Sequence, residues 1–396
     1  MALSMLCSDV QGIVLGQLCN PLEPRLAMYF SSASSELRAL LTQTMRQQLR
    51  ADHEAMAALC RKMGMSSCKE LREAWVVRWW NKGLSAANLA TLGTLGSMLP
   101  ALAHLTLGES SGSASPDGVQ RLVAGLGAGA LPAVTMLGLH MHVGDAGASA
   151  LAAALGQGAL PRLRSLLLTD AGLGDAALVA LAPALRRRPA LEKLGLYGNP
   201  FGDEGLAALV APPPPAGTMP LLIGGLKKLK TLDLRYTQVS DAGYAALATA
   251  LDSGALPALE SLKLDGIPAS VAAKEAVHAA LARSTARAEA TKLAAAALRS
   301  AINRNESGPL ESALELAEAC GLQGHVVWRS RVERAQRALN RLRQEAERLV
   351  NPGTRVRLVC SSCGTRCEVF IPKSPKPKRC IVRCPKCKAM NGPQLY

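Results

Sequence analysis

Residues 160–188 read LPRLRSLLLTDAGLGDAALVALAPALRRR, and this stretch contains two hydrophobic periods in succession. In the first half, Leu166 and Leu168 alternate with other residues, so both leucines point to one side of a short strand. A turn containing Gly174-Asp175 follows, and the rest is an alanine and leucine stretch with helical spacing. The stretch therefore predicts one strand followed by one helix.

This strand–helix unit recurs about every 29 residues, which predicts a repeat protein. Further copies begin at Leu131, Pro189, Leu226 and Leu256, and a less regular copy begins at Leu99. An aspartate stands at the N-cap or in the first turn of four predicted helices: Asp145, Asp175, Asp203 and Asp241. One strand and one helix cannot bury their apolar faces alone, whereas stacked copies can. We therefore expect an α/β solenoid with its strands inside and its helices outside.

The units resemble leucine-rich repeats of the ribonuclease-inhibitor type over about residues 88–285. This resemblance implies a parallel sheet on the concave side. Relatives usually carry Asn or Cys shortly after the L-x-L pair, where the side chain bonds neighbouring backbone, and only Asn199 fits here. The other units have different residues at that position: Ser110, His142, Ala171, Thr237 and Ile267. A proline-rich insertion at 211–220 is either a spacer or a docking site for a partner.

Four segments are predicted: helical 1–85, repeats 86–285, a helical hairpin or short coiled coil at 286–350, and a cysteine-rich module at 351–396. The order of features in the first segment resembles an F-box. A leucine, an acidic residue, a helix and a proline-bearing turn are followed by Arg25-Leu26-Ala27, serines and Leu37-Arg38. This resemblance implies docking on a Skp-type adaptor, as in the substrate receptors of cullin ubiquitin ligases. Glu36-Leu37 stand where that family often has tryptophan, and a plain helical cap for the solenoid fits equally well.

Two tryptophans near the start of the repeats, Trp75 and Trp79, are four residues apart. We expect them on one face of a helix, where they pack on the first repeat or form an aromatic patch for a partner.

The helical segment at 286–350 ends in an arginine-rich helix with apolar residues at helical spacings. Its basic face contains Arg331, Arg334, Arg337, Arg341 and Arg348. This face is either solvated and paired with Glu333, Glu345 and Glu347, or it contacts nucleic acid.

Six of the eleven cysteines lie close to the C-terminus. Cys360 and Cys363 form one C-x-x-C pair, and Cys384 and Cys387 form a second. Strand-like sequence surrounds both pairs, so the segment resembles a zinc ribbon in which the four thiolates hold one structural Zn²⁺. Cys367 and Cys380 are further ligands, a redox pair or packed side chains. The five scattered cysteines are expected to be small buried hydrophobes.

The cysteine-rich segment is also strongly basic. From Arg355 onward it has ten Lys and Arg residues against one acid, Glu368. A patch of this kind favours nucleic acid, an acidic protein or anionic lipid. The residues predicted to make such contacts are Lys373, Lys376, Lys378, Arg379, Arg383 and Lys386. A soluble basic surface is the alternative, and the sparse aromatic residues argue against the reading of single strands.

The sequence contains none of the common phosphate-loop, zinc-protease or serine-hydrolase motifs, so we expect no enzyme. The chain has 396 residues, 49% hydrophobic and 3% aromatic, and a net charge of +15. It shows no secretory signal and no long apolar span, which predicts a cytoplasmic or nuclear protein. The repeats are expected to bind a protein target through six residues on the concave face: Tyr197, Asp233, Arg235, Tyr236, Lys263 and Asp265. A nucleic-acid-associated scaffold is the alternative.

Overall fold

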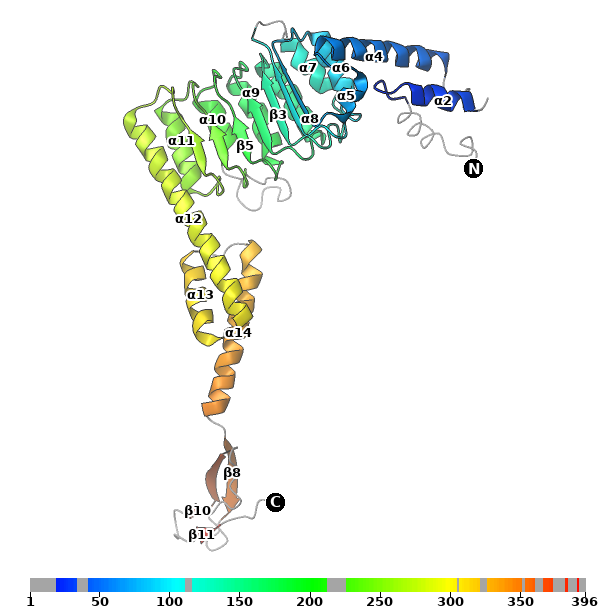
Figure 1. Cartoon of the computed structure of the whole chain (residues 1–396). Helices are drawn as coiled ribbons and strands as arrows, with labels where there is room; N and C mark the ends of the chain where they lie inside the picture. Colours follow the sequence, from blue (N-terminus) through cyan, green and yellow to red (C-terminus); the bar gives the residue numbers. More distant parts are fainter. Residues whose placement is uncertain are drawn as a thin grey trace. The chain divides into compact units, whose positions relative to one another are not determined.

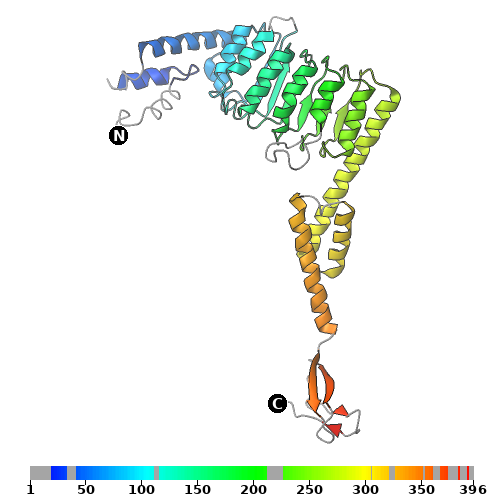
Figure 2. The same ribbon diagram turned by 180° about the vertical axis from the view of Figure 1, so that it is seen from behind.

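The computed structural model describes residues 19–33, 42–110, 116–211, 226–304, 306–320 and 326–350, with four further strands at 353–359, 366–372, 382–383 and 390–391. The chain divides into two compact units, Met1–Ala286 and Arg287–Tyr396, which are described separately. Figures 1 and 2 show the elements of each unit from two sides. Within the described part, no helix is both long and apolar enough to cross a bilayer.

Seven parallel strands form the sheet of the first unit, and they stand in sequence order. They are β1 (Val76–Trp80), β2 (His104–Gly108), β3 (Met136–His140), β4 (Ser165–Leu168), β5 (Lys193–Gly195), β6 (Thr231–Asp233) and β7 (Ser261–Lys263). The L-x-L leucines lie in register, so that Leu166 faces Leu194 and Leu194 faces Leu232 on neighbouring strands. The predicted α/β repeat architecture is confirmed for this unit.

One face of this sheet is covered by the helices that connect the strands, and the other face is open (Figures 1 and 2). The connecting helices are α6 (Ala86–Thr94), α7 (Pro116–Ala124), α8 (Gly144–Gly156), α9 (Asp175–Arg186), α10 (Asp203–Val210) and α11 (Asp241–Asp252). Their inward leucines and the L-x-L leucines form one continuous buried cluster. We call the uncovered side of the sheet the open face.

The prediction of a helix around Trp75 and Trp79 is wrong, because residues 76–80 form strand β1. The run VVRWW consists largely of β-branched and aromatic residues, and its burial alternates along the strand. Val77 and Trp79 enter the core, whereas Arg78 and Trp80 are exposed. The parallel sheet therefore includes a strand that precedes residue 86, where the repeats were expected to begin.

Asn199 bonds neighbouring backbone as predicted. It is 1% exposed, and its Oδ1 accepts hydrogen bonds from the amides of Ala171 and Leu173. Its Nδ2 donates to the carbonyls of Leu168, Leu196 and Tyr197. One amide thus satisfies the backbone of two successive turns.

An unexpected residue bonds the backbone at the first repeats. Glu109 is 5% exposed, and its Oε1 accepts from the amides of Lys82 and Leu84. Ser110, which the L-x-L spacing indicated, instead donates to Asn81. The carboxylate therefore makes the two acceptor bonds that the Asn199 amide makes elsewhere.

The predicted aspartates all lie in the first turns of their helices. Their carboxylates, however, cap the next helix along the chain. Asp175 accepts from the amides of Gly202 and Gly205, and Asp203 accepts from the amides of Ser240 and Gly243. Each side chain therefore ties two successive repeats together.

Before the first strand of the sheet, the chain forms α2 (Arg25–Ala33), α4 (Gln43–Lys62) and α5 (Cys68–Glu73). Cys60 and Cys68 are buried among them, which confirms two of the predicted hydrophobic cysteines, while Cys19 and Cys320 are half-buried. Cys7 and the leucine stripe around Leu37 lie outside the described residues.

In the second unit, the end of α12 (Val271–Arg304), α13 (Ser307–Ala319) and α14 (Val326–Val350) pack around an apolar cluster. Small alanines dominate the contact, with Leu298, Leu310 and Leu339 filling its centre. β8 (Gly353–Val359) pairs antiparallel with β9 (Arg366–Pro372), and β10 (Val382–Arg383) pairs antiparallel with β11 (Met390–Asn391).

Candidate functional site

The register of the sheet fixes which side chains share the open face. One row runs across β1 to β7 and contains Arg78, Thr106, Gly138, Leu167, Gly195, Asp233 and Lys263. The middle of this row is Gly138, Leu167 and Gly195, and the side chains of His140, Thr106 and Leu167 cover the two glycines. The charged and aromatic residues gather toward its two ends.

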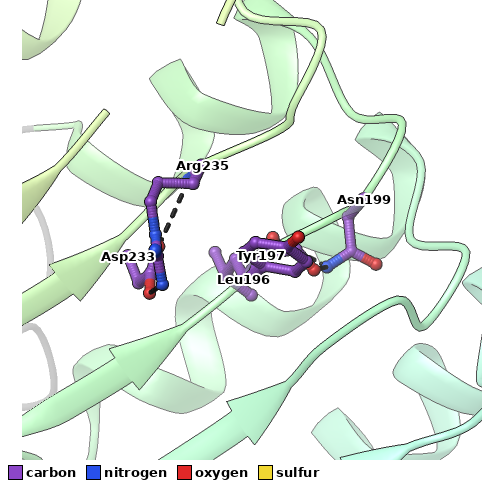
Figure 3. Close-up of polar contacts among 5 residues, drawn as sticks. All are labelled: Leu196, Tyr197, Asn199, Asp233 and Arg235. Carbon is purple, nitrogen blue, oxygen red and sulfur yellow. Dashed lines mark hydrogen bonds and ion pairs between the residues drawn. The ribbon is translucent and has the colours of Figure 1, made fainter. Parts of the chain in front are cut away.

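An ion pair stands at the centre of the site near β6. The Arg235 guanidinium donates to both carboxylate oxygens of Asp233, over 2.9 and 2.8 Å (Figure 3). Burial by itself raises the pKa of the Asp233 carboxyl, but the hydrogen bonds and charge of Arg235 outweigh burial and lower it. The guanidinium carbon also lies 5.2 Å from the centre of the Tyr197 ring, within cation–π range.

Two tyrosines extend this group. The rings of Tyr197 and Tyr236 meet edge to face at 5.1 Å and 61°. Tyr236 has φ +55° and is 57% exposed. The equivalent turn positions in adjacent units are glycines, Gly198 and Gly266, with φ +69° and +68°. A bulky residue in this left-handed conformation is strained. Asp170 at the same turn position of another unit and the buried Leu131 and Leu160 also have positive φ, and of the three bulky residues Tyr236 is the exposed one.

These residues border a shallow hollow of about 370 Å³ on the open face. Its lining includes Tyr197, Asp233, Arg235 and Lys263, together with Lys193. Among the residues that the structure describes, neither lysine has an ion-pair partner. Since Arg235 neutralises Asp233, the hollow carries the positive charge of the two lysines.

The structure brings together most of the predicted binding residues. We call Tyr197, Asp233, Arg235, Tyr236 and Lys263 the C-terminal cluster. Asp265 is not part of the hollow. It borders an adjacent depression of about 350 Å³ together with Lys263, Lys274 and His278.

A second aromatic group lies near the other end of the open face, and sequence reasoning missed its arrangement. The Trp80 ring lies 4.7 Å from the His140 ring, and the Trp75 ring lies 5.0 Å from the His104 ring. Trp75 and Trp80 are 63% and 47% exposed. The alternation within VVRWW could have placed Trp80 on this face, had the segment been read as a strand. Burial lowers the pKa of His140, and Asp170 partly offsets the effect.

The four predicted zinc ligands lie outside the described residues, as do Cys380 and the basic residues between 373 and 379. Each C-x-x-C pair falls in the connection between two antiparallel strands, β8–β9 for the first and β10–β11 for the second. Within the described ranges, no three His, Cys, Asp or Glu side chains are grouped to hold a metal. Four thiols in two such pairs fit the donor set that zinc prefers.

Comparison with known proteins supports the repeats. Residues 225–248 match a family model described as Leucine Rich repeat, and they include β6 and the first part of α11. A search of curated proteins gave no match. Matching solved structures number 55 chains. One is "Leiomodin-1 Actin-Binding Site 2 (ABS2)", with 14% identity and a TM-score of 0.31, covering 52% of this chain and 93% of that chain. The matched segment and the parallel sheet are typical of a protein-interaction module with leucine-rich repeats.

Proposed function

We propose that this protein is a non-enzymatic recognition module that holds a protein target against the open face, mainly through the C-terminal cluster. The observation that carries this proposal is Tyr236, an exposed aromatic residue held in a strained backbone conformation beside Tyr197 and Arg235. Tyrosine and arginine are enriched at the energetic centres of protein interfaces. The hollow beside them gives a partner side chain a place to insert.

Affinity capture with the full chain tests this proposal. The variant Tyr236→Asn with Lys263→Gln removes two exposed side chains of the cluster, and asparagine tolerates a positive φ. The control Val179→Ser with Arg187→Gln removes an equal charge and an apolar group from exposed positions on and next to α9. We expect bound protein to fall at least about tenfold for the first variant only. Equal losses in both variants would reject the open face as the binding surface.

A finer proposal concerns the N-terminal segment, which we infer to be an adaptor-binding element of a cullin ubiquitin ligase. Arg25-Leu26-Ala27 of the F-box-like pattern begin helix α2. Ala27 is buried, whereas Leu26 and Tyr29 are 43% and 69% exposed. Exposed apolar side chains on a short helix are the contacts that docking on an adaptor needs.

Co-purification of the full chain with a Skp-type adaptor tests the finer proposal. Leu26→Asp with Tyr29→Asp should abolish the complex, while Leu316→Asp, at an exposed position on α13, should leave it intact. Failure of the unaltered chain to bind the adaptor favours the alternative, in which this segment only caps the solenoid.

A second candidate function is association with nucleic acid through the basic tail, and the ten basic residues from Arg355 onward favour it. We propose that Cys360, Cys363, Cys384 and Cys387 hold one Zn²⁺ that stabilises this tail. The purified full chain should contain about one zinc per molecule, and Cys384→Ser should lose it, whereas Cys320→Ser should retain it. A metal-free unaltered protein would reject the zinc site.

A further inference from the structure

We propose that helix α14 binds the phosphate backbone of duplex nucleic acid through a stripe of three arginines. Arg334, Arg337 and Arg341 are exposed, and none forms an ion pair within the described residues. The residues of this site are different from those of the open face and of the basic tail.

The fold directs the stripe outward. Val332, Ala335 and Leu339 are buried against α12 and α13, so the opposite side of α14 faces solvent. The three arginines follow at intervals of three and four residues and so share that side. They span about 10 Å along the helix axis, which matches a short run of phosphates.

The only described ion pairs of α14 leave the stripe free. Arg329 pairs with Glu333 at 3.8 Å, and Arg343 pairs with Glu311 of α13 at 2.8 Å. The Nε of Arg341 donates to the carbonyl of Arg337, and its remaining guanidinium donors have no described partner. Guanidinium groups bind phosphate through two parallel hydrogen bonds, which favours a phosphate ligand.

The charge of the second unit supports this class of ligand. Helix α14 has seven arginines against three glutamates, a net +4, and the residues from Arg355 onward add +9 to the net +12 of the second unit. The described, exposed side chains of α14 are all polar. Gln336, Asn340 and Gln344 flank the stripe, as does Glu333, whose carboxylate pairs with Arg329. Protein interfaces have an apolar core, whereas interfaces with nucleic acid are polar and positively charged.

Two other polyanions fit less well. The apolar side of α14 is already buried in the helical cluster, so it cannot enter a lipid surface. Trp328, the single aromatic residue of α14, packs on the same cluster and lies 4.7 Å from the Arg331 guanidinium. No free ring remains on this helix for stacking with unpaired bases, which favours a duplex over a single strand.

Fluorescence anisotropy with a labelled 20-base-pair DNA duplex and an RNA duplex of the same sequence tests the proposal on the full chain. The variant Arg334→Gln, Arg337→Gln, Arg341→Gln keeps good helix formers in α14. The control Arg25→Gln, Arg162→Gln, Arg187→Gln removes the same charge from exposed sites of the first unit. We expect the stripe variant to lose at least about tenfold in affinity at 100 mM salt and two to three units of salt slope. In the control, the change in log affinity and the change in salt slope should each be no more than about a third of the change in the stripe variant.

A tail variant, Lys376→Gln, Lys378→Gln, Arg379→Gln, separates this site from the tail. Loss of duplex binding in the tail variant alone, with the stripe variant unchanged, overturns the proposal. Equal loss of duplex binding in the stripe variant and in the control also overturns the proposal. The absence of duplex binding by the unaltered chain overturns it as well. Binding of poly-glutamate or of phosphatidylserine vesicles with the same affinity and the same dependence on the stripe rejects nucleic acid as the specific partner. Circular dichroism verifies that every variant keeps its helix content.

Discussion

At the scale of single residues, Tyr236 is the position where local strain and proposed function meet. Its φ of +55° costs free energy that glycine avoids. We expect Tyr236→Gly to change the free energy of unfolding by less than about 1 kcal/mol, because the relieved strain offsets lost ring contacts. Capture of the protein partner should nevertheless fall sharply.

Urea unfolding followed by tryptophan fluorescence measures this change, with Gly198→Ala as the comparison. The φ of Gly198 is +69°, which disfavours any side chain, and an added Cβ would also collide with the Asp170 carboxylate, so this variant should lose at least about 1 kcal/mol. A larger loss in Tyr236→Gly than in Gly198→Ala would show that Tyr236 serves the fold rather than a partner.

Asn199 has the opposite role, since it is buried and serves the fold. Asn199→Ala leaves several backbone groups of two repeats without partners, and it should lower the free energy of unfolding by about 3 kcal/mol or more. Thr237→Val removes a single buried hydrogen bond, to the Leu234 carbonyl, and should cost about 1 kcal/mol. Equal costs in urea unfolding would contradict the bonding role of Asn199.

His140 makes the open face sensitive to pH. Burial lowers the pKa of His140 in the folded chain below the ordinary histidine pKa of about 6.5. At a pH just below about 6.5, the unfolded chain therefore binds more protons at this histidine than the folded chain does. The contribution of His140 to stability is therefore present above about pH 6.5 and is lost as pH falls through the lowered folded-state value. Protonation also changes the environment of the Trp80 ring.

Tryptophan fluorescence in a His104→Gln background isolates this pair. We expect a titration step with its midpoint below about pH 6.5, which is absent from His104→Gln with His140→Gln. A midpoint at or above that pH would contradict the effect of burial.

At the scale of elements, the repeats are joined by aspartates that cap their neighbours. Asp203→Ala removes the bonds to the Ser240 and Gly243 amides and to the Ser240 hydroxyl, and it should cost about 1–2 kcal/mol. Glu204→Ala, at the next and exposed position of α10, should cost less than about 0.5 kcal/mol. Urea unfolding distinguishes the two, and similar losses would mean that only charge near the helix N-terminus matters.

The elements also show what the sequence reveals and what it hides. The L-x-L pairs and the alanine-rich stretches predict β3 to β7 and their helices, because burial in a stacked repeat requires both periods. The same rule missed β1, where Val77 and Trp79 stand in register with the leucines of β2. Glu109 was missed because a charged residue is not expected in the core until its amide partners are known. The capping of the following helix by Asp175 and Asp203 depends on contacts between repeats, which no single repeat encodes.

The candidate site also has some features that the sequence predicted and others that it did not. Alternation along the strands placed Tyr197, Asp233, Arg235 and Lys263 on one face, and they line one hollow. The positive φ of Tyr236 and the tryptophan–histidine pairs were not visible in the sequence, because they depend on turn geometry and on strand register. The proposed metal and tail residues remain predictions.

At the scale of the whole molecule, the proposed protein-binding face belongs to the first unit, and most of the net charge belongs to the second. The first unit presents the open face with little net charge, and the second unit carries +12 of the total +15. A protein target and a nucleic acid would therefore bind at separate sites. Charge removal from α14 should leave protein capture unchanged, and removal of the C-terminal cluster should leave duplex binding unchanged.

Site-specific photo-crosslinking identifies the face of the repeats that the protein partner contacts. A benzoylphenylalanine replaces Tyr236 on the open face in one full-length protein and Val179 on α9 in another, since both positions are exposed. We expect a covalent adduct with the bound protein partner from position 236 and none from position 179. Adducts from position 179 alone, or equally from both positions, would contradict recognition through the open face.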